Sequence, residues 1–344
     1  MVEMQRPRWL KCNDQDSLKH NVFAMQEPHE RTFSMKLLSK AVVLLLTIIF
    51  IVGCSQSGST ETEGNTAPPP VASGTFVIPI PTASGIDVES NDKASIDYSN
   101  IKDGYIIAEY REKTDKTLRV VVTAPHGEMY VYSLSDGGKA EIIPLTEGDG
   151  EYRIGIYERF EADSFVMIVS IAVDVELKDE YAPFIHPNQF VNFTRESELV
   201  SLAAELTKDA ETVEEKFTAI YDYVVDNFTY DYELAATVRS GYIPSLDEVL
   251  HRKEGICFDY SALVTAMLRS QGIPTRLEIG YHGEQYHAWI SKFCDENGWI
   301  ERRYHHDGED WTMMDPTVES GARRIHGSRQ EARDDDDYRL MYSY

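Results

Sequence analysis

Three side chains that together can perform nucleophilic catalysis lie in the C-terminal part of the sequence: Cys257, His287 and Asp315. A cysteine thiolate is a strong nucleophile, an imidazole can accept the thiol proton, and a carboxylate can orient the imidazole through its second nitrogen. A cysteine considered alone is more often a small buried residue than a nucleophile. The catalytic interpretation therefore depends on the elements that would bring the three residues together.

Cys257 begins a predicted helix that runs to about residue 271, where Gly272 and Pro274 end it. The N-terminus of a helix stabilises a thiolate through the peptide dipole, and its free backbone N–H groups can bind an oxyanion. Gly255 allows a sharp turn just before the cysteine. We therefore expect the position of Cys257 to activate its thiol.

His287 and Asp315 fall within or directly after predicted strands that follow this helix. The expected strands cover residues 275–281, 287–293, 299–304 and 311–314, with turn-forming residues between them. Hairpins between consecutive antiparallel strands can place His287 and Asp315 side by side. Apolar residues at helical spacing predict another helix over residues 213–228, so helices come first and an antiparallel sheet second, in an α+β order.

The motifs around these residues resemble the core of the transglutaminase-like superfamily over roughly residues 190–320. The resemblance implies a papain-like fold in which the cysteine helix packs on an antiparallel sheet carrying the histidine and the aspartate. It implies acyl transfer from a glutamine side chain or a peptide carbonyl, through a thioester, to an amine or to water. The matching segments are 255–260 (GICFDY), 267–269 (MLR), 272–276 (GIPTR), 280–281 (GY), 287–289 (HAW), 298–299 (GW) and 315–317 (DPT).

The resemblance is incomplete upstream of the cysteine. Animal transglutaminases use an upstream indole to help hold the oxyanion, whereas residues 228–232 read FTYDY and contain no tryptophan. Tyr232 or Tyr230 is a candidate for oxyanion support, and aromatic packing at a helix end is an equally good interpretation of both. The sequence shows no EF-hand-like loop, so calcium dependence has no support from it. We expect no cofactor and no metal, and we interpret His305 and His306 as part of a solvated loop.

The front of the chain predicts an address outside the cytoplasmic membrane. Residues 35–54 combine a short basic head with an apolar run that is shorter than the ~20 residues of a comfortable membrane span, which is typical of a signal peptide. The run ends in IVGC, which resembles a bacterial lipobox, so Cys54 is the predicted lipidation site. An uncleaved signal anchor is the alternative. We interpret residues 1–34 as an extension foreign to the native protein, with Met35 as the true start, and residues 55–75 as a flexible linker.

The remaining cysteines, Cys12 and Cys294, belong to no disulfide framework or CxxC motif. If the strand that carries His287 is regular, Cys294 points to its opposite face, and we expect a free thiol there.

An all-β domain is predicted between the linker and the helices. Short segments rich in β-branched and aromatic residues, separated by turn signals, indicate a β-sandwich-like domain over residues 76–180, with a spacer or recognition role. The transglutaminase-like domain is expected over residues 190–344. It ends in a last strand at about residues 338–342, which follows an acidic run at 334–337.

The formal net charge of −25 argues against nucleic acid as a partner, because phosphate binding needs a basic surface.

The three candidate catalytic residues and the N-terminal address together predict a lipid-anchored cysteine enzyme on the extracytoplasmic face of the membrane. Its expected substrates are protein or peptide amides, with cell-wall peptides among the candidates. Two alternatives stay open: a non-catalytic binding or scaffold module of the envelope, and a chain whose β-domain binds wall polymer with the C-terminal domain auxiliary.

Overall fold

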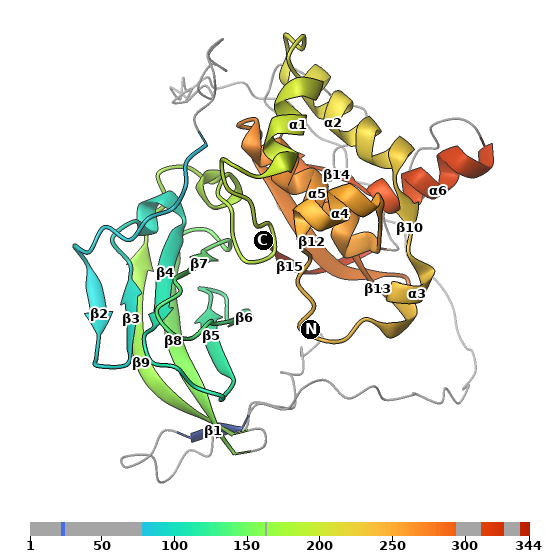
Figure 1. The fold of residues 1–344 in the computed structure, drawn as a ribbon. Helices are drawn as coiled ribbons and strands as arrows, with labels where there is room; N and C mark the ends of the chain where they lie inside the picture. The colour runs from blue at the N-terminus through green and yellow to red at the C-terminus, as the bar shows by residue number, and fades with distance from the viewer. Residues whose placement is uncertain (1–21, 25–77, 162–163, 294–310, 327–337) are drawn as a thin grey trace, which may run out of the picture.

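The computed structural model describes residues 22–24, 78–161, 164–293, 311–326 and 338–344. Strands form one part of the molecule, and helices packed against a further sheet form the other (Figure 1). The predicted α+β class, with an all-β part ahead of the helices, is confirmed. Several predicted features lie outside the described residues. They are the signal segment, the linker, the expected strand at 299–304, His305 and His306, and the cysteines Cys12, Cys54 and Cys294.

The N-terminal part is built from two antiparallel sheets. Residues such as Ile96, Val120 and Ile154, which come from both sheets, are buried in one hydrophobic core. A short strand from within residues 1–34 pairs with β9 at the edge of the larger sheet. The larger sheet contains β1 (Val22–Ala24), β9 (Ser164–Val175), β8 (Gly150–Glu161), β5 (Leu118–Thr123) and β6 (Met129–Ser133), and the smaller contains β2 (Val88–Ser90), β3 (Ala94–Asp97), β4 (Tyr105–Tyr110) and β7 (Glu141–Pro144).

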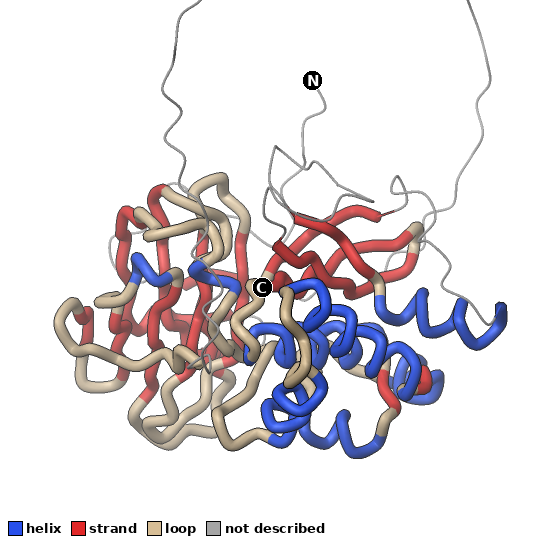
Figure 2. The backbone as a smooth tube through the Cα atoms, turned by 90° about the horizontal axis from the view of Figure 1, so that it is seen from above, coloured by secondary structure: helices blue, strands red, loops and turns tan. Residues whose placement is uncertain are grey.

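The C-terminal part packs helices on one face of a four-stranded sheet, as the view from above shows (Figure 2). The helix that begins at Cys257, α5, lies at its centre and is buried from Asp259 to Ser270. The strand order is β14 (Trp311–Met314), β13 (Gln285–Phe293), β12 (Thr275–His282) and β15 (Tyr338–Ser343). The helices are α1 (Glu198–Leu206), α2 (Val213–Asn227), α3 (Tyr232–Thr237), α4 (Leu246–Arg252), α5 (Cys257–Ser270) and α6 (Pro316–His326).

Local sequence signals explain the two helices that carry most of the core. The apolar stripe of α2 is buried, and Thr212 and Glu215 close its N-terminus in a reciprocal capping box, with bonds of 3.1 Å in each direction. Helix α5 ends at the predicted place, because Gly272, just after its C-terminus, adopts a left-handed φ of 81°. Two short strands, β10 (Thr229–Tyr230) and β11 (Glu254–Gly255), then pair in parallel just before α5.

One buried arginine joins three segments around the junction of the two parts. Arg269 of α5 is fully buried and donates hydrogen bonds to the backbone carbonyls of Thr275, His186 and Tyr344, at 2.9, 2.6 and 2.6 Å. Burial lowers its pKa to about 9. The ring of Tyr344 also stacks edge-on against Tyr130 of the sandwich, with centroids 5.5 Å apart. The last strand is therefore fixed between α5 and the β-sandwich.

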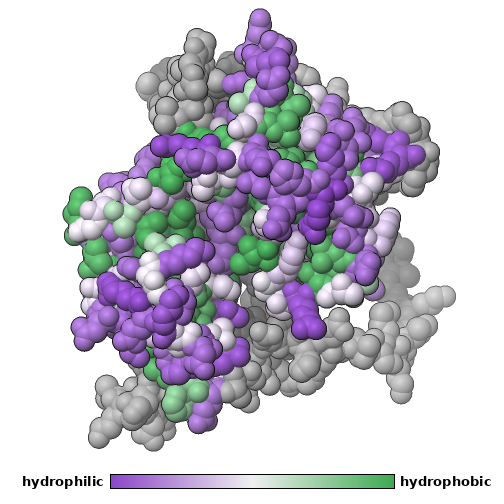
Figure 3. Space-filling view, in the orientation of Figure 1, coloured by the Kyte–Doolittle hydropathy of each residue, from purple (hydrophilic) through white to green (hydrophobic). Residues whose placement is uncertain are grey.

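Within the described residues no helix is long and apolar enough to cross a membrane. The face seen in Figure 3 is mostly hydrophilic, and its apolar residues form separate small areas.

Candidate active site

Cys257 is the first residue of α5, and its thiol is free and half-buried. The path of the backbone just before Cys257 depends on Gly255, because a Cβ at that position would lie 2.6 Å from the Cβ of Asp259. The absence of this Cβ lets the Asp259 carboxylate reach back and accept a hydrogen bond of 2.8 Å from the N–H of Ile256. The cysteine therefore stands at a capped and rigid helix start, where the peptide dipole favours a thiolate.

Asp259 is itself a buried carboxylate that sequence reasoning did not single out. Its second oxygen accepts a hydrogen bond of 2.8 Å from the hydroxyl of Tyr242, which lies in the connection between α3 and α4. Burial raises the pKa of Asp259, and the bonds to Ile256 and Tyr242 work against that rise. The hydrogen bond between Tyr242 and Asp259 holds the segment around Tyr242 against the start of α5. A glycine two residues before the helix and an aspartate at its third position were the available sequence signal.

His287 lies on β13, across the ladder from Gly280 of β12. Its Nε2 is 2.7 Å from Oδ2 of Asp315. A hydrogen bond from the hydroxyl of Ser261, in the first turns of α5, to the carbonyl of Ala288 holds the helix against this strand at 3.1 Å. With Nε2 engaged by the carboxylate, Nδ1 is the ring nitrogen left for Cys257.

The pKa of His287 reflects both neighbours. Burial alone lowers the pKa, but hydrogen bonds to Asp315 and to Cys257, together with the charges of both groups, outweigh burial and raise it to about 10. An imidazole with this pKa is protonated at neutral pH. The carboxylate on one side of the ring and the sulfur on the other therefore both favour the protonated form of His287.

Asp315 is almost completely buried and accepts hydrogen bonds on both oxygens. Oδ1 accepts from the N–H and hydroxyl of Thr317 and from the N–H of Val318, each at 3.0 Å, so Asp315 is the N-cap of α6. Oδ2 accepts from His287 and from the Tyr338 hydroxyl, both at 2.7 Å. Burial raises the pKa of Asp315, but these bonds, that to His287 foremost, bring it below its usual value and keep the carboxylate charged.

The two tyrosines predicted as oxyanion support are placed differently. Tyr230 ends β10 directly beside Gly255, with the N–H of Asp231 bonded to the Gly255 carbonyl at 2.9 Å. Burial and the nearby Cys257 charge raise the pKa of Tyr230 to about 12, so its hydroxyl stays protonated and able to donate. Tyr232 is 79% exposed, and its ring stacks edge-on against that of Tyr230. Proximity to the sulfur therefore favours Tyr230 of the two.

One group of side chains among the described residues has the spacing of a metal site: His282, His287 and Asp315, whose ligand atoms lie within 4.8 Å of one another. The 2.7 Å bond between His287 and Asp315 already uses two of these atoms. The ring of His282 stacks on that of Tyr338, with centroids 4.2 Å apart. Hydrogen bonding thus accounts for the contact between His287 and Asp315 without a metal.

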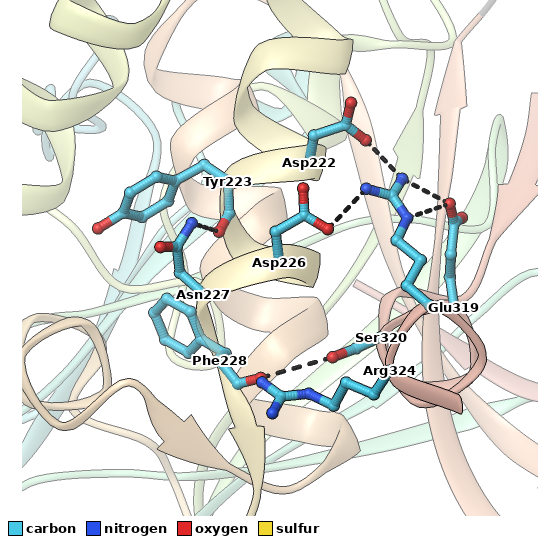
Figure 4. A network of polar contacts seen from close by, with 9 residues as sticks. Asp222, Tyr223, Asp226, Asn227, Phe228, Glu319, Ser320 and Arg324 are labelled. Carbon is cyan, nitrogen blue, oxygen red and sulfur yellow. Dashed lines mark hydrogen bonds and ion pairs between the residues drawn. The ribbon is translucent and has the colours of Figure 1, made fainter. Parts of the chain in front are cut away.

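Helix α6, which begins next to Asp315, was not among the helices predicted from the sequence. It is held to α2 by Arg323, which pairs with Asp222 at 2.6 Å, with Asp226 at 2.9 Å and with Glu319 at 2.6 Å. Figure 4 shows the three carboxylates converging on one guanidinium between the helices. Arg324 and Ser320 both donate to the carbonyl of Phe228, which directly precedes β10. These bonds position the N-cap of α6, and hence the carboxylate that holds His287.

Comparison with known proteins matches the segment that contains Cys257 and His287 to a family model. Residues 200–302 match the family model of the transglutaminase-like superfamily. A curated relative from Bacillus subtilis, uncharacterized protein YebA, is 26% identical over 187 residues, which is 48% of this chain and 25% of that protein. A protein-glutamine gamma-glutamyltransferase from Pseudomonas aeruginosa is 28% identical over 91 residues, 25% of this chain and 13% of that protein. The chain thus spans a quarter or less of these curated relatives.

The solved structures that resemble this chain include the periplasmic domain of TgpA from Pseudomonas aeruginosa bound to ethylmercury. The likeness covers 71% of this chain and 80% of that one, with a TM-score of 0.31 and 13% identity. Red sea bream transglutaminase resembles 62% of this chain over 48% of its own, with a TM-score of 0.28 and 14% identity.

Proposed function

This chain carries a domain of the transglutaminase-like superfamily, and we propose that it is a cysteine enzyme acting on protein or peptide amides through a thioester. The observation that supports this most directly is the ordered series of Asp315, His287 and Cys257, in which a buried carboxylate lies 2.7 Å from Nε2 of the imidazole and the cysteine begins helix α5. A binding scaffold would not require a buried, multiply bonded aspartate on the far side of that histidine.

The reaction follows from these positions. The Cys257 thiolate attacks the amide carbonyl carbon, forming a C–S bond, while backbone N–H groups at the start of α5 receive the developing oxyanion. Protonated His287 gives its Nδ1 proton to the leaving nitrogen, the C–N bond breaks, and an amine or ammonia departs. Water or a second amine then attacks the thioester, His287 accepts its proton, and Cys257 is released as thiolate. Hydrolysis and transamidation share the same steps and differ only in the nucleophile that attacks the thioester, which is water in the first and an amine in the second.

We further propose that the enzyme works at the extracytoplasmic face of the membrane, anchored by lipid on Cys54. The basic, apolar and lipobox-like order of residues 35–54 supports this address, and residues 55–75 supply the tether. An envelope location makes cell-wall peptides and surface proteins the natural amide substrates. No basic surface for nucleic acid is expected, because the net charge is −25.

Mass spectrometry of wall peptides and surface proteins tests the proposal and separates its two branches. The full chain and its Cys257→Ala variant are incubated with these substrates, with and without an added primary amine. Loss of ammonia on joining two chains indicates transamidation, whereas gain of water on chain cleavage, or conversion of an amide to an acid, indicates hydrolysis. Identical spectra for wild type and variant would contradict catalysis on these substrates.

A further inference from the structure

We propose that Tyr338 is a positioning residue of the active site, which holds the Asp315 carboxylate in the orientation that His287 requires. This inference rests on the proposed cysteine chemistry and adds to it a residue that none of the matched motifs contains. Tyr338 begins β15, far along the chain from the segments that resemble the family core.

The hydrogen bonds of Asp315 show what the tyrosine contributes. Its hydroxyl donates at 2.7 Å to Oδ2, the same oxygen that accepts from His287. The other oxygen is held from the opposite side by Thr317 and Val318 of the helix cap. Without Tyr338, Oδ2 would keep only the imidazole among the partners that the described residues supply, while the cap bonds still held Oδ1. The tyrosine therefore restrains Oδ2 independently of the state of the histidine.

The ring of Tyr338 is itself held rigidly. It lies face to face with His282, with centroids 4.2 Å apart and an angle of 7° between the planes. It also meets the buried ring of Trp289 edge-on, with centroids 5.1 Å apart. A ring fixed on two sides delivers its hydroxyl to one place, so little conformational entropy is lost when the bond to Asp315 forms.

The register of the sheet brings the tyrosine to this position. Tyr338 pairs with His282 of β12, and His287 pairs with Gly280 on the same strand, so these side chains share one face of the sheet. Gly280 lies at a bulge in the β12–β15 ladder, where a Cβ would come within 2.0 Å of the Arg339 carbonyl oxygen and 2.8 Å of Trp289. The absence of a side chain at Gly280 thus permits the close approach of β15.

The pH dependence of the site identifies the tyrosine's role, because within the part of the chain that the structure describes Asp315 is the carboxylate bonded directly to His287. Removing the Tyr338 hydroxyl takes away one of the bonds that lower the pKa of Asp315. The carboxylate then protonates at a higher pH, and the thiolate–imidazolium pair fails at a higher pH. The titratable groups that face Asp315 are His287 of β13, His282 of β12, Tyr338 of β15, Tyr221 of α2, Tyr230 of β10 and, next to His287, Cys257 of α5.

The test is the rate of Cys257 alkylation by iodoacetamide as a function of pH, measured on the full chain by mass spectrometry of the Cys257 peptide. Tyr338→Phe keeps the ring contacts and removes only the hydroxyl. Tyr98→Phe, a partly buried tyrosine of the β-sandwich outside the site, is the matched control. His287→Ala establishes whether the reaction depends on the histidine at all.

We expect Tyr338→Phe to react about tenfold more slowly at neutral pH, the size of effect typical of a hydrogen bond to a charged group, and its acid limb to move to higher pH. Tyr98→Phe keeps the wild-type profile. If labelling depends on His287 but Tyr338→Phe matches Tyr98→Phe in rate and acid limb, the inference is overturned while the proposed function stands. If labelling is indifferent to His287, the proposed function itself fails.

Discussion

The carboxylate of Asp315 binds the imidazole of His287 at 2.7 Å through one oxygen and caps helix α6 through the other. The residue that orients the base is therefore also the residue that starts a helix. Anything that moves α6 moves the histidine's partner, which couples the packing of a surface helix to the proposed chemistry.

Replacing Asp315 by Asn tests the charge of this contact. The amide can still occupy the cap, but it no longer stabilises an imidazolium, so the pKa of His287 should fall well below about 10. We expect alkylation of Cys257, and turnover once a substrate is known, to drop about 10²- to 10⁴-fold. NMR titration of the His287 ring reports the pKa directly. An unchanged titration in Asp315→Asn, with exposed Asp92→Asn as control, would refute the assigned role.

Stability should depend on pH in a direction set by the same pair. The pKa of His287 is raised to about 10 in the folded chain from an ordinary value of 6.5. Its contribution to the free energy of unfolding is thus complete below about pH 6.5 and disappears as pH rises through about 10. Asp315 has a lowered pKa, so its contribution is present above its ordinary value of 3.8 and is lost as pH falls further. Urea unfolding of wild type and His287→Gln across pH measures the difference, which should shrink toward pH 10. A constant difference would contradict the pairing.

Arg323→Met should loosen α6. The substitution leaves Glu319, whose side chain is about 10% exposed, without its cation, and it releases Asp222 and Asp226. We expect a loss of roughly 1–3 kcal/mol in the free energy of unfolding and slower alkylation of Cys257, because the cap at Asp315 moves with the helix. Chemical denaturation measures the loss in the free energy of unfolding, and the alkylation assay measures the rate at Cys257.

Lys208→Met is the matched control, since its pair with Glu205 is exposed and should contribute at most about 1 kcal/mol. Equal stability losses in the two variants would show that the Arg323 cluster has no special role.

Arg269→Met should be the most damaging change outside the site. The guanidinium is the donor to three buried carbonyls, those of His186, Thr275 and Tyr344, and methionine leaves all three without it. The Tyr344 carbonyl also accepts from the N–H of Leu277 at 2.9 Å, so it keeps one partner. At about 1–3 kcal/mol for each of the other two groups, the free energy of unfolding should fall by at least roughly 2 kcal/mol. Circular dichroism melts measure the loss. A loss below about 1 kcal/mol would mean that these bonds do not hold the last strand to α5.

Much of the fold followed from local signals. The start of α5 at Cys257, its end at Gly272, the stripe of α2 and the strand expected at 275–281 lie where residue pattern and turn chemistry predict them. These elements are specified by residues a few positions apart, so a single sequence is enough to find them.

The finer arrangement of the site depends on long-range contacts. The contact between His287 and Asp315 was anticipated, but in the structure β14 pairs directly with β13, and the strand expected at 299–304 lies outside the described residues. Helix α6 was missed although Asp315 followed by Pro316 is a recognised helix start. Tyr338 carries no local signal, because its partner is 23 residues away and its approach depends on a bulge at Gly280. The domain bounds and the lipid anchor at Cys54 stay predictions.

The central claim, that His287 activates Cys257 as a nucleophile, is tested most directly by iodoacetamide labelling of the full chain at neutral pH, resolved by peptide for each cysteine. The account predicts fast, selective modification of Cys257 that disappears in His287→Ala, with Cys294 labelled slowly in both. Equal and slow labelling of Cys257 and Cys294, unaffected by His287→Ala, would contradict it.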